Sequence, residues 1–362
     1  MAKKLTYDPV LFAVIMVLLL LGVAMVYSAG TAVARAQGLE ANAFLIRQLT
    51  WALLGLCIGG VLMVVDYRHL RRRIVVYGAL VAVVSMLVAA LFSPALNETH
   101  RWLFVGSLSV QPSELAKLSL IVFIAYQIER HQGQLGQDLK HMLPVGIAVG
   151  LFAGLVVLEP DLGTACMLAV IAAVMLFLAG MRWRWVISGA LFGGAALAMF
   201  IVAAEYRRQR LFAFLAPERD PLGSGFQALQ SLIAVGSGGL LGRGPGRSLQ
   251  KLYFLPYPHS DFIYAIVAEE LGMLGAMSVL VLFGVFLWRG IRAGFRAPDA
   301  FGRFLAWGIT TAVVLQALIN ISVVVALLPT KGIPLPFISY GGSSLVVTLA
   351  ACGLLLNVSQ HG

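Results

Sequence analysis

The chain has 362 residues, of which 60% are hydrophobic and only 12% are charged, and its formal net charge is +10. A soluble globular domain is about 25% charged and about 45–50% apolar, so this composition excludes a water-soluble core and favours an integral membrane protein. The positive charge does not indicate nucleic acid, because many of the basic residues lie in short segments between apolar runs.

Ten apolar runs approach or exceed the ~20 residues that cross a hydrocarbon layer as a helix. They lie approximately at 9–28, 45–65, 74–93, 112–128, 143–158, 163–180, 185–203, 262–288, 304–328 and 340–358. The fifth and sixth are separated only by EPDLG, which predicts a tight hairpin. No A-x-A cleavage site follows MAKKLTYDP, so the first run is expected to be a retained helix. The predicted fold is an all-α integral membrane protein, with residues 1–362 forming a single polytopic domain.

Lys and Arg predict the orientation of these helices, because cytoplasmic loops are enriched in both. With the N-terminus inside, the short outer loops hold only Arg35, Arg101 and Lys331, with Arg47 at a helix edge. Both termini are therefore expected in the cytoplasm. The basic residues assigned to the inner face are Lys3, Lys4, Arg68, Arg71, Arg72, Arg73, Arg130, Lys140, Arg182, Arg184, Arg289, Arg292, Arg296 and Arg303.

Residues 204–260 form an exception, a large extracytoplasmic loop between helices seven and eight. Long loops escape the charge rule, and loops of this length are usually functional or disordered. Amphipathic stretches such as GFQALQSLIAVGSGGLLG predict a segment folded on the outer membrane surface. Its basic residues, which include Arg210 and Lys251, would face an anionic partner at the lipid headgroups.

Three acids occur in the stretch YPHSDFIYAIVAEELG. Asp261 closes the basic loop and opens the eighth apolar run. Ser260 or Asp261 can cap a helix there, and this role does not exclude Asp261 as a general base. Desolvation would raise the pKa of Asp261 and nearby Arg would lower it, and the sequence does not decide between them. Glu269 lies two turns further along the same expected helical face, beside Glu270. Both are interpreted as structural intramembrane acids in a salt bridge or a neutral hydrogen bond.

Two further stretches place charges at the expected outer ends of helices. In RWLFVGSLSVQPSELAKL, Glu114 and Lys117 can form an intrahelical ion pair, which either neutralises buried charge or positions a polar headgroup. In LEPDLGTA, Glu159 and Asp161 either hold a divalent cation or serve as turn and cap residues.

The stretch LPTKGIPLPFISYGGSSL leads into the last helix. It lacks the Lys of a phosphate-binding loop, so a nucleotide site is not expected. It predicts a rigid loop with close backbone approach at Gly341 and Gly342, and with Lys331 at the outer face. All these motifs converge on one side of the membrane and suit a pyrophosphate-bearing lipid, since Arg and Lys bind phosphate oxygens and acids transfer protons or hold metal.

At these residues the chain resembles the SEDS family (shape, elongation, division and sporulation), which contains FtsW and RodA. Five motifs carry the resemblance in order and extend over nearly the whole chain, with Ser260 standing where the family often has Thr. The matching stretches are Gln111–Lys117, Glu159–Ala165, Asp220–Gln227, His259–Ile263 with Glu269–Gly272, and Gly332–Ser344.

The resemblance implies ten transmembrane helices and an inverting peptidoglycan glycosyltransferase that polymerises lipid II, the undecaprenyl-pyrophosphate disaccharide-pentapeptide, at the outer face of the bacterial cytoplasmic membrane. It implies a cognate class B penicillin-binding protein and other division proteins as partners, with no nucleic acid. Asp261 matches the family's essential aspartate and would deprotonate the acceptor 4-hydroxyl. Mg²⁺ or Mn²⁺ is the candidate cofactor, and no organic cofactor is expected. The residues assigned to substrate binding are Arg101, Glu114, Lys117, Arg210, Lys251, His259, Lys331 and Ser339.

Three alternatives stay open at this point. The loop and C-terminal motifs favour a division-type, septal polymerase over an elongation-type one. A lipid II flippase is the second class, although its polar groups are expected through the whole membrane depth rather than at one face. A catalytically silent scaffold for division proteins is the third.

Overall fold

The computed structural model of the chain describes residues 6–94, 100–105, 108–131, 139–220, 223, 225–252 and 254–362. Lys3 and Lys4 of the orientation argument lie outside the described residues, as do Pro221, Leu222 and Ser224 of the third family motif.

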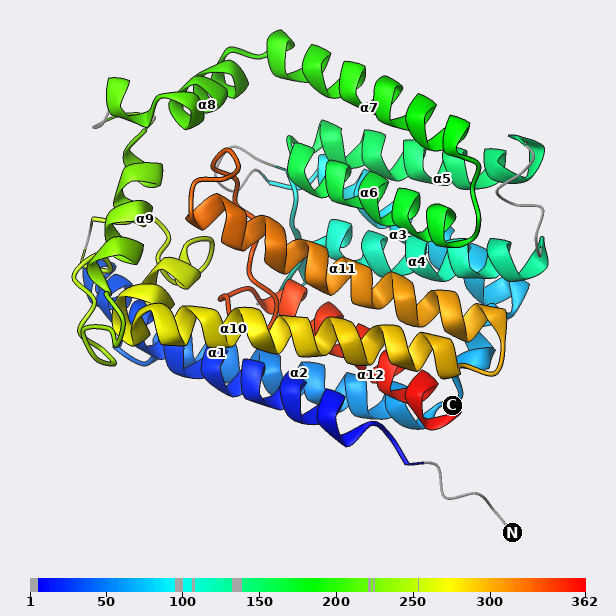
Figure 1. Cartoon of the computed structure of the whole chain (residues 1–362), viewed down its shortest axis with the longest axis horizontal. Coiled ribbons are helices and arrows are strands. Elements are labelled where there is room, and N and C mark those ends of the chain that lie inside the picture. The colour runs from blue at the N-terminus through cyan, green and yellow to red at the C-terminus, as the bar shows by residue number, and fades with distance from the viewer. Residues whose placement is uncertain are drawn as a thin grey trace.

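The described chain is a bundle of long helices with one small β-hairpin (Figure 1). Strands β1 (Leu103–Val105) and β2 (Leu108–Val110) pair antiparallel, and the sequence did not predict them. The long helices are α1 (Pro9–Ala36), α2 (Ala43–Val64), α3 (Arg73–Leu91), α4 (Pro112–Arg130), α5 (Leu139–Leu158), α6 (Leu162–Leu178), α7 (Trp183–Ala203), α10 (Ile263–Arg296), α11 (Ala300–Val324) and α12 (Gly342–Gln360). The short ones are η1 (Tyr67–Arg71), α8 (Glu205–Leu215), η2 (Pro217–Arg219) and α9 (Phe226–Ser237).

Each of the ten predicted apolar runs overlaps a long helix, although the helix of the eighth run is interrupted at Gly272, and the chain is a multi-pass, all-α membrane protein. Among the described residues, eight helices are long and apolar enough to cross a membrane, and α6 is apolar but shorter, at 17 residues. Helix α4 is outside this set, since it carries four charged side chains, Glu114, Lys117, Glu129 and Arg130. The number of ten crossings therefore stays a prediction.

Both ends of the chain lie at the same end of the bundle. The backbone N–H of Asp8 donates to the Ser359 hydroxyl at 3.2 Å, and the Asp8 carboxylate pairs with Arg289 of α10. Asp8 also caps α1 by accepting from the N–H groups of Val10 and Leu11. This arrangement agrees with the prediction that both termini face one compartment (Figure 1).

The centre of the bundle is α12, whose side chains are almost all buried, and α2 packs closely against it. A Cβ atom on Gly353 would lie 2.2 Å from the Gly59 carbonyl oxygen, and one on Gly59 would lie 2.7 Å from the carbonyl oxygen of Leu349. Small residues allow such backbone contact, which drives helix association where lipid replaces water. None of the described side chains of α7 is buried, in contrast.

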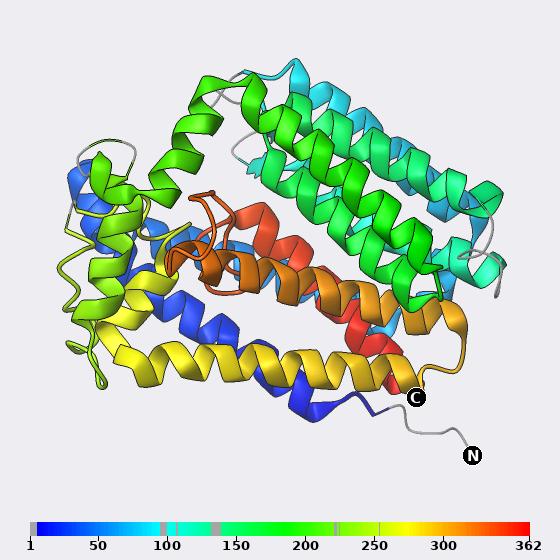
Figure 2. The ribbon, with the colours of Figure 1, turned by 45° about the horizontal axis from the view of Figure 1, so that its top comes forward.

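The predicted loop 204–260 is more ordered than its turn-rich sequence suggests. It contains α8, η2 and α9, and α9 packs against α10 and α11. Figure 2 shows α8 and α9 at the end of the bundle away from both termini. Its assignment to the extracytoplasmic side stays a prediction.

Candidate active site

The chain reverses direction at Gly272, in the middle of the expected eighth helix. Gly272 has φ of 69°, a left-handed value that breaks the helix. The Tyr264 hydroxyl donates to the Ala276 carbonyl at 3.1 Å, whereas residues twelve apart in a continuous helix lie about 18 Å apart. The segment 263–271 therefore folds back along 273–296. The prediction that residues 262–288 form one continuous spanning helix was therefore wrong, and Asp261 precedes the helical segment that carries Glu269.

The segment 325–341, between α11 and α12, turns back into the bundle (orange in Figure 1). A Cβ atom on Gly22, near the middle of α1, would collide with the Phe337 carbonyl oxygen, and the Phe337 ring lies 6.1 Å from that of Phe286. Irregular backbone at this depth requires internal hydrogen bonds and burial in protein. The Ser339 hydroxyl meets this requirement by accepting from the N–H of Leu335 and donating to the carbonyl of Ser260.

Asp261 lies where these two segments meet. A Cβ atom on Gly332 would lie 2.8 Å from a carboxylate oxygen of Asp261, so Gly332 leaves room for this side chain. Asp261 does not cap α10, whose N-cap is Phe262 with no side-chain hydrogen bond. The close approach predicted at Gly342 is present against Trp51, but a Cβ on Gly341 would meet only Ser344, at 3.9 Å.

Burial raises the pKa of the Asp261 carboxyl from 3.8 to about 6, and the charge of Asp161 adds to this effect. The charges of Arg101, Arg210 and Lys331 act in the opposite direction without cancelling it. The structure thus decides the balance that the sequence left open, in favour of desolvation. A carboxylate with this pKa is mostly ionised at neutral pH and is a stronger base than an exposed aspartate.

Three predicted residues gather beside Asp261 around the α5–α6 hairpin. Asp161 pairs with Lys331 at 3.2 Å and with Arg101 at 3.7 Å, and it caps α6 by accepting from the Thr164 N–H. Burial alone would raise the pKa of Asp161, but these cations and the Thr164 hydrogen bonds outweigh it, and the pKa falls below its usual value. The site therefore holds two cationic side chains that are only partly neutralised.

Glu159 and Asp161 do not fit a divalent cation. Glu159 is fully buried, neither of its carboxylate oxygens has a hydrogen-bond partner, and burial raises its pKa to about 8, with a contribution from Asp161. A neutral carboxylic acid is a poor metal ligand, and the oxygens of Asp161 face cations. Nowhere in the described ranges do three His, Cys, Asp or Glu side chains form a group that could hold a metal.

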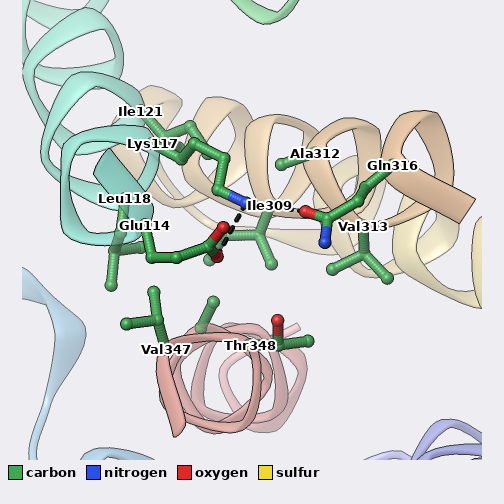
Figure 3. Close-up of a pocket in the computed structure, with 11 residues that line it drawn as sticks. Glu114, Lys117, Leu118, Ile121, Ile309, Ala312, Val313, Gln316, Val347 and Thr348 are labelled. Atoms are coloured by element: carbon green, nitrogen blue, oxygen red, sulfur yellow. Dashed lines mark hydrogen bonds and ion pairs between the residues drawn. The ribbon is translucent and has the colours of Figure 1, made fainter. Parts of the chain in front are cut away.

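A second polar group lies between α4, α11 and α12, lining a small cavity of about 30 Å³ (Figure 3). The predicted ion pair forms here, with Lys117 Nζ 2.8 Å from a Glu114 oxygen, and Lys117 also donates to Gln316 at 2.6 Å. Gln316 in turn donates to the Pro334 carbonyl at 2.9 Å. The pair is thereby connected to the segment that carries Lys331.

A third group fastens the segment 243–251 to the reversal at Gly272. Lys251 pairs with Glu270 at 2.7 Å and donates to the Ser28 hydroxyl of α1, and Glu269 accepts from the Ser248 hydroxyl and the Leu249 N–H. Glu269 and Glu270 are each about 1% exposed. Lys251 therefore belongs to a buried ion pair with Glu270 and is not one of the cations around Asp261.

The remaining predicted residues have mixed surroundings. His259 packs against the rings of Phe44 and Tyr340, which also contact each other, and burial lowers the pKa of His259 to about 4. Ser339 is buried and links the two segments of the site. Arg210 of α8 is exposed, and its charge lowers the pKa of Asp261.

Sequence reasoning missed two amides on α11 that hold the site together. Asn320 donates to the carbonyl oxygens of Asp261 and Ile333, at 2.8 and 2.7 Å, and Gln316 lies one helical turn earlier. Both are buried. The available signal was two amide side chains four residues apart in an apolar helix, which share one face and need partners.

The fold and the site define a multi-pass membrane protein with a desolvated carboxylate and several cations at the end of the bundle opposite its termini. Residues 8–362 match the FtsW/RodA/SpoVE family model, described as cell cycle protein, and the chain belongs to this family.

Relatives and a solved structure agree over nearly the full length. The chain is 39% identical to "Probable peptidoglycan glycosyltransferase FtsW" of Geobacter metallireducens, with 98% of this chain and 95% of that protein covered. It is 40% identical to "Stage V sporulation protein E" of Bacillus subtilis, with coverages of 99% and 98%. A chain solved in a peptidoglycan synthase complex that coordinates polymerization and crosslinking is similar at a TM-score of 0.80 and 32% identity, with 98% of both chains covered.

Proposed function

We propose that this protein is a peptidoglycan glycosyltransferase that polymerises lipid II, and that it acts in septal synthesis during cell division. Family membership and the names of its relatives support the activity. The observation that carries the assignment to a site is Asp261, a partly buried carboxyl with a raised pKa that faces Gly332 among several cations.

In the proposed reaction Asp261 accepts the proton of the acceptor 4-hydroxyl. The oxygen bonds to the anomeric carbon of the donor with inversion, while the bond to the pyrophosphate breaks and undecaprenyl pyrophosphate leaves. Lys331, Arg101 and Arg210 stabilise the charge that develops on the leaving group, because cations in a water-poor site act more strongly than in water. No step passes through a metal, and the expected Mg²⁺ or Mn²⁺ requirement stays a prediction that a chelator titration tests.

The assembly proposed around this site has three parts. The site faces the outside of the cytoplasmic membrane. This orientation follows because the short loops at the opposite end of the bundle carry the basic residues expected on the cytoplasmic side. A class B penicillin-binding protein crosslinks the product, by analogy with the synthase complex to which the chain is similar. Other division proteins recruit this pair to the septum.

The test uses the full chain purified with its cognate penicillin-binding protein and supplied with fluorescently labelled lipid II. Wild type and an Asp66→Asn control, altered at the opposite end of the bundle, are expected to give equal polymer, and Asp261→Asn none. Polymer from Asp261→Asn at the wild-type rate would exclude it as the base. Transfer of lipid II across a proteoliposome membrane without polymer would instead support the flippase.

A further inference from the structure

A cavity of about 490 Å³ opens immediately before Asp261 in the chain, and the mechanism above does not use it. It lies between the C-terminal end of α1, the N-terminal end of α2 and the segment 256–259. Tyr340, from the segment 325–341, lines its remaining side. The backbone N–H of Tyr340 donates to the His259 carbonyl at 2.9 Å. Its size is within the range of about 300–1,000 Å³ typical of small-molecule sites.

The lining combines aromatic rings with one cation. Phe44, His259 and Tyr340 pack against one another with ring centroids 4.7–5.5 Å apart. Tyr257 is 52% exposed and holds a strained φ of 53°, which a bulky residue rarely adopts. Arg47 is exposed, and no acidic side chain pairs with it in the part of the chain that the structure describes.

The polar groups at the cavity favour a neutral, hydroxyl-bearing ring. His259 lines the cavity, and because its pKa is low its imidazole is neutral, which suits a neutral partner better than an anion. Its Nδ1 is shielded from solvent, without a partner among the described residues, and is not itself open to the cavity. Aromatic faces bind the C–H faces of pyranose rings, and an Arg at the rim pairs with a carboxylate or phosphate.

The cavity differs from the cationic side of the site in both composition and position. Arg101, Lys331 and Asp161 belong to the α5–α6 hairpin and the segments against it, and none of them lines the cavity. A leaving pyrophosphate requires several cations, which that side supplies. The cavity supplies rings and a single cation, two residues from the proposed base.

We propose that the cavity formed by Phe44, Arg47, Tyr257, His259 and Tyr340 is a saccharide subsite that binds the acceptor glycan, with its anionic substituent on Arg47. The proposal rests on the proposed function and names the substrate that this side of the site takes. It places the acceptor ring where the following residues, Ser260 and Asp261, can reach its hydroxyl.

The test separates the two substrates. Lipid II with its 4-hydroxyl blocked can serve only as donor, and the lipid-free disaccharide-pentapeptide, which lacks a leaving group, only as acceptor. With the complex at saturating donor, Arg47→Gln and Tyr257→Leu are expected to raise the KM for the acceptor about tenfold, which corresponds to about 1.4 kcal/mol. The KM for the donor and the kcat are expected to stay within about twofold. Arg35→Gln, an exposed Arg at the same end outside the cavity, is the matched control.

The anionic group that binds Arg47 is either a peptide carboxylate or a phosphate of the acceptor. A second acceptor, a disaccharide with one phosphate and no peptide, distinguishes the two. Weaker use of the pentapeptide acceptor by Arg47→Gln assigns Arg47 to the peptide carboxylates, and weaker use of the phosphate acceptor assigns it to phosphate. An unchanged KM for both acceptors in both variants, with active wild type, overturns the subsite alone. Absence of product from wild type with every substrate pair overturns the proposed function instead. Equilibrium binding of the disaccharide-pentapeptide to Asp261→Asn, with and without Arg47→Gln, gives the same comparison without turnover.

Discussion

Replacing Asp261 by Asn should make the protein more stable at neutral pH while it abolishes polymerisation. Asn has the same shape as Asp and carries no charge, so it removes the cost of burying a carboxylate without leaving a cavity. The structure places this carboxyl against Gly332, where the two folded-back segments meet, and its burial there is the origin of that cost.

The magnitude follows from the pKa of Asp261, which burial raises from 3.8 to about 6. Each pKa unit corresponds to about 1.4 kcal/mol, so the ionised carboxylate costs the folded state about 3 kcal/mol. At pH 7 the group is ionised in both the folded and the unfolded state, and the full cost applies. Between about pH 6 and pH 4 the folded state binds a proton first, so the cost declines and then vanishes. The gain from Asn should therefore be largest at pH 7 and absent near pH 4.

Thermal unfolding in detergent between pH 4 and pH 8 measures this difference. Asp299→Asn is the contrasting control, because hydrogen bonds from Gly302 and Tyr67 and the charge of Arg68 outweigh its burial and lower the pKa of Asp299. Its substitution should cost stability at pH 7 and less at low pH, the opposite sign. An Asp261→Asn protein that melts no higher than wild type at pH 7, or that keeps its gain at pH 4, would refute the reasoning about burial.

Four further outcomes are expected. The polymerisation rate of the wild-type complex should fall about tenfold per pH unit below about pH 6, because protonated Asp261 cannot act as a base; a flat pH–rate profile down to pH 5 would contradict this. Lys331→Gln should move this acid limb to higher pH, since Lys331 lowers the pKa of Asp261, and the same profile measures it. Asn320→Leu leaves two buried carbonyl oxygens without donors, at about 1–3 kcal/mol each, and should lower both the melting temperature and kcat; unchanged values of both would remove Asn320 from the site. Lys251→Met leaves Glu270 unpaired and should cost about 3–5 kcal/mol of stability in a melting assay, most of which the added change Glu270→Gln recovers; a single variant as stable as wild type would show that the pair contributes little.

The sequence predicted most of the helices because a membrane imposes a simple length rule. Apolar runs had to be near 20 residues, and the EPDLG stretch was too short for anything but a turn, so the α5–α6 hairpin was predicted correctly. For Asp161 in this stretch the sequence left open a metal ligand or a helix cap, and in the structure Asp161 is the N-cap of α6. The structure also pairs Asp161 with Lys331, a contact between segments about 170 residues apart in sequence that no local pattern contains.

The reversal at Gly272 could not be predicted by the same rule. The residues from Ile263 to Arg296 are mostly apolar apart from Glu269, Glu270 and three arginines near the C-terminal end, and this pattern does not distinguish one long helix from two that fold back. The helix is broken by a tertiary contact. The N–H groups of Met273 and Leu274 donate to the carbonyl oxygens of Gly239 and Leu240, so a distant segment replaces the hydrogen bonds that the helix loses.

The polar groups around the site explain how irregular segments stay in place inside a membrane protein. Burial of apolar surface gives little driving force where the surroundings are lipid, so hydrogen bonds and ion pairs must hold such segments. Glu269 and Glu270 hold the segment that precedes Asp261, and Gln316 and Asn320 hold the one that carries Lys331. The acids and amides within the apolar helices therefore act on Asp261 through the backbone. Their loss should therefore displace the base as well as lower the stability of the protein.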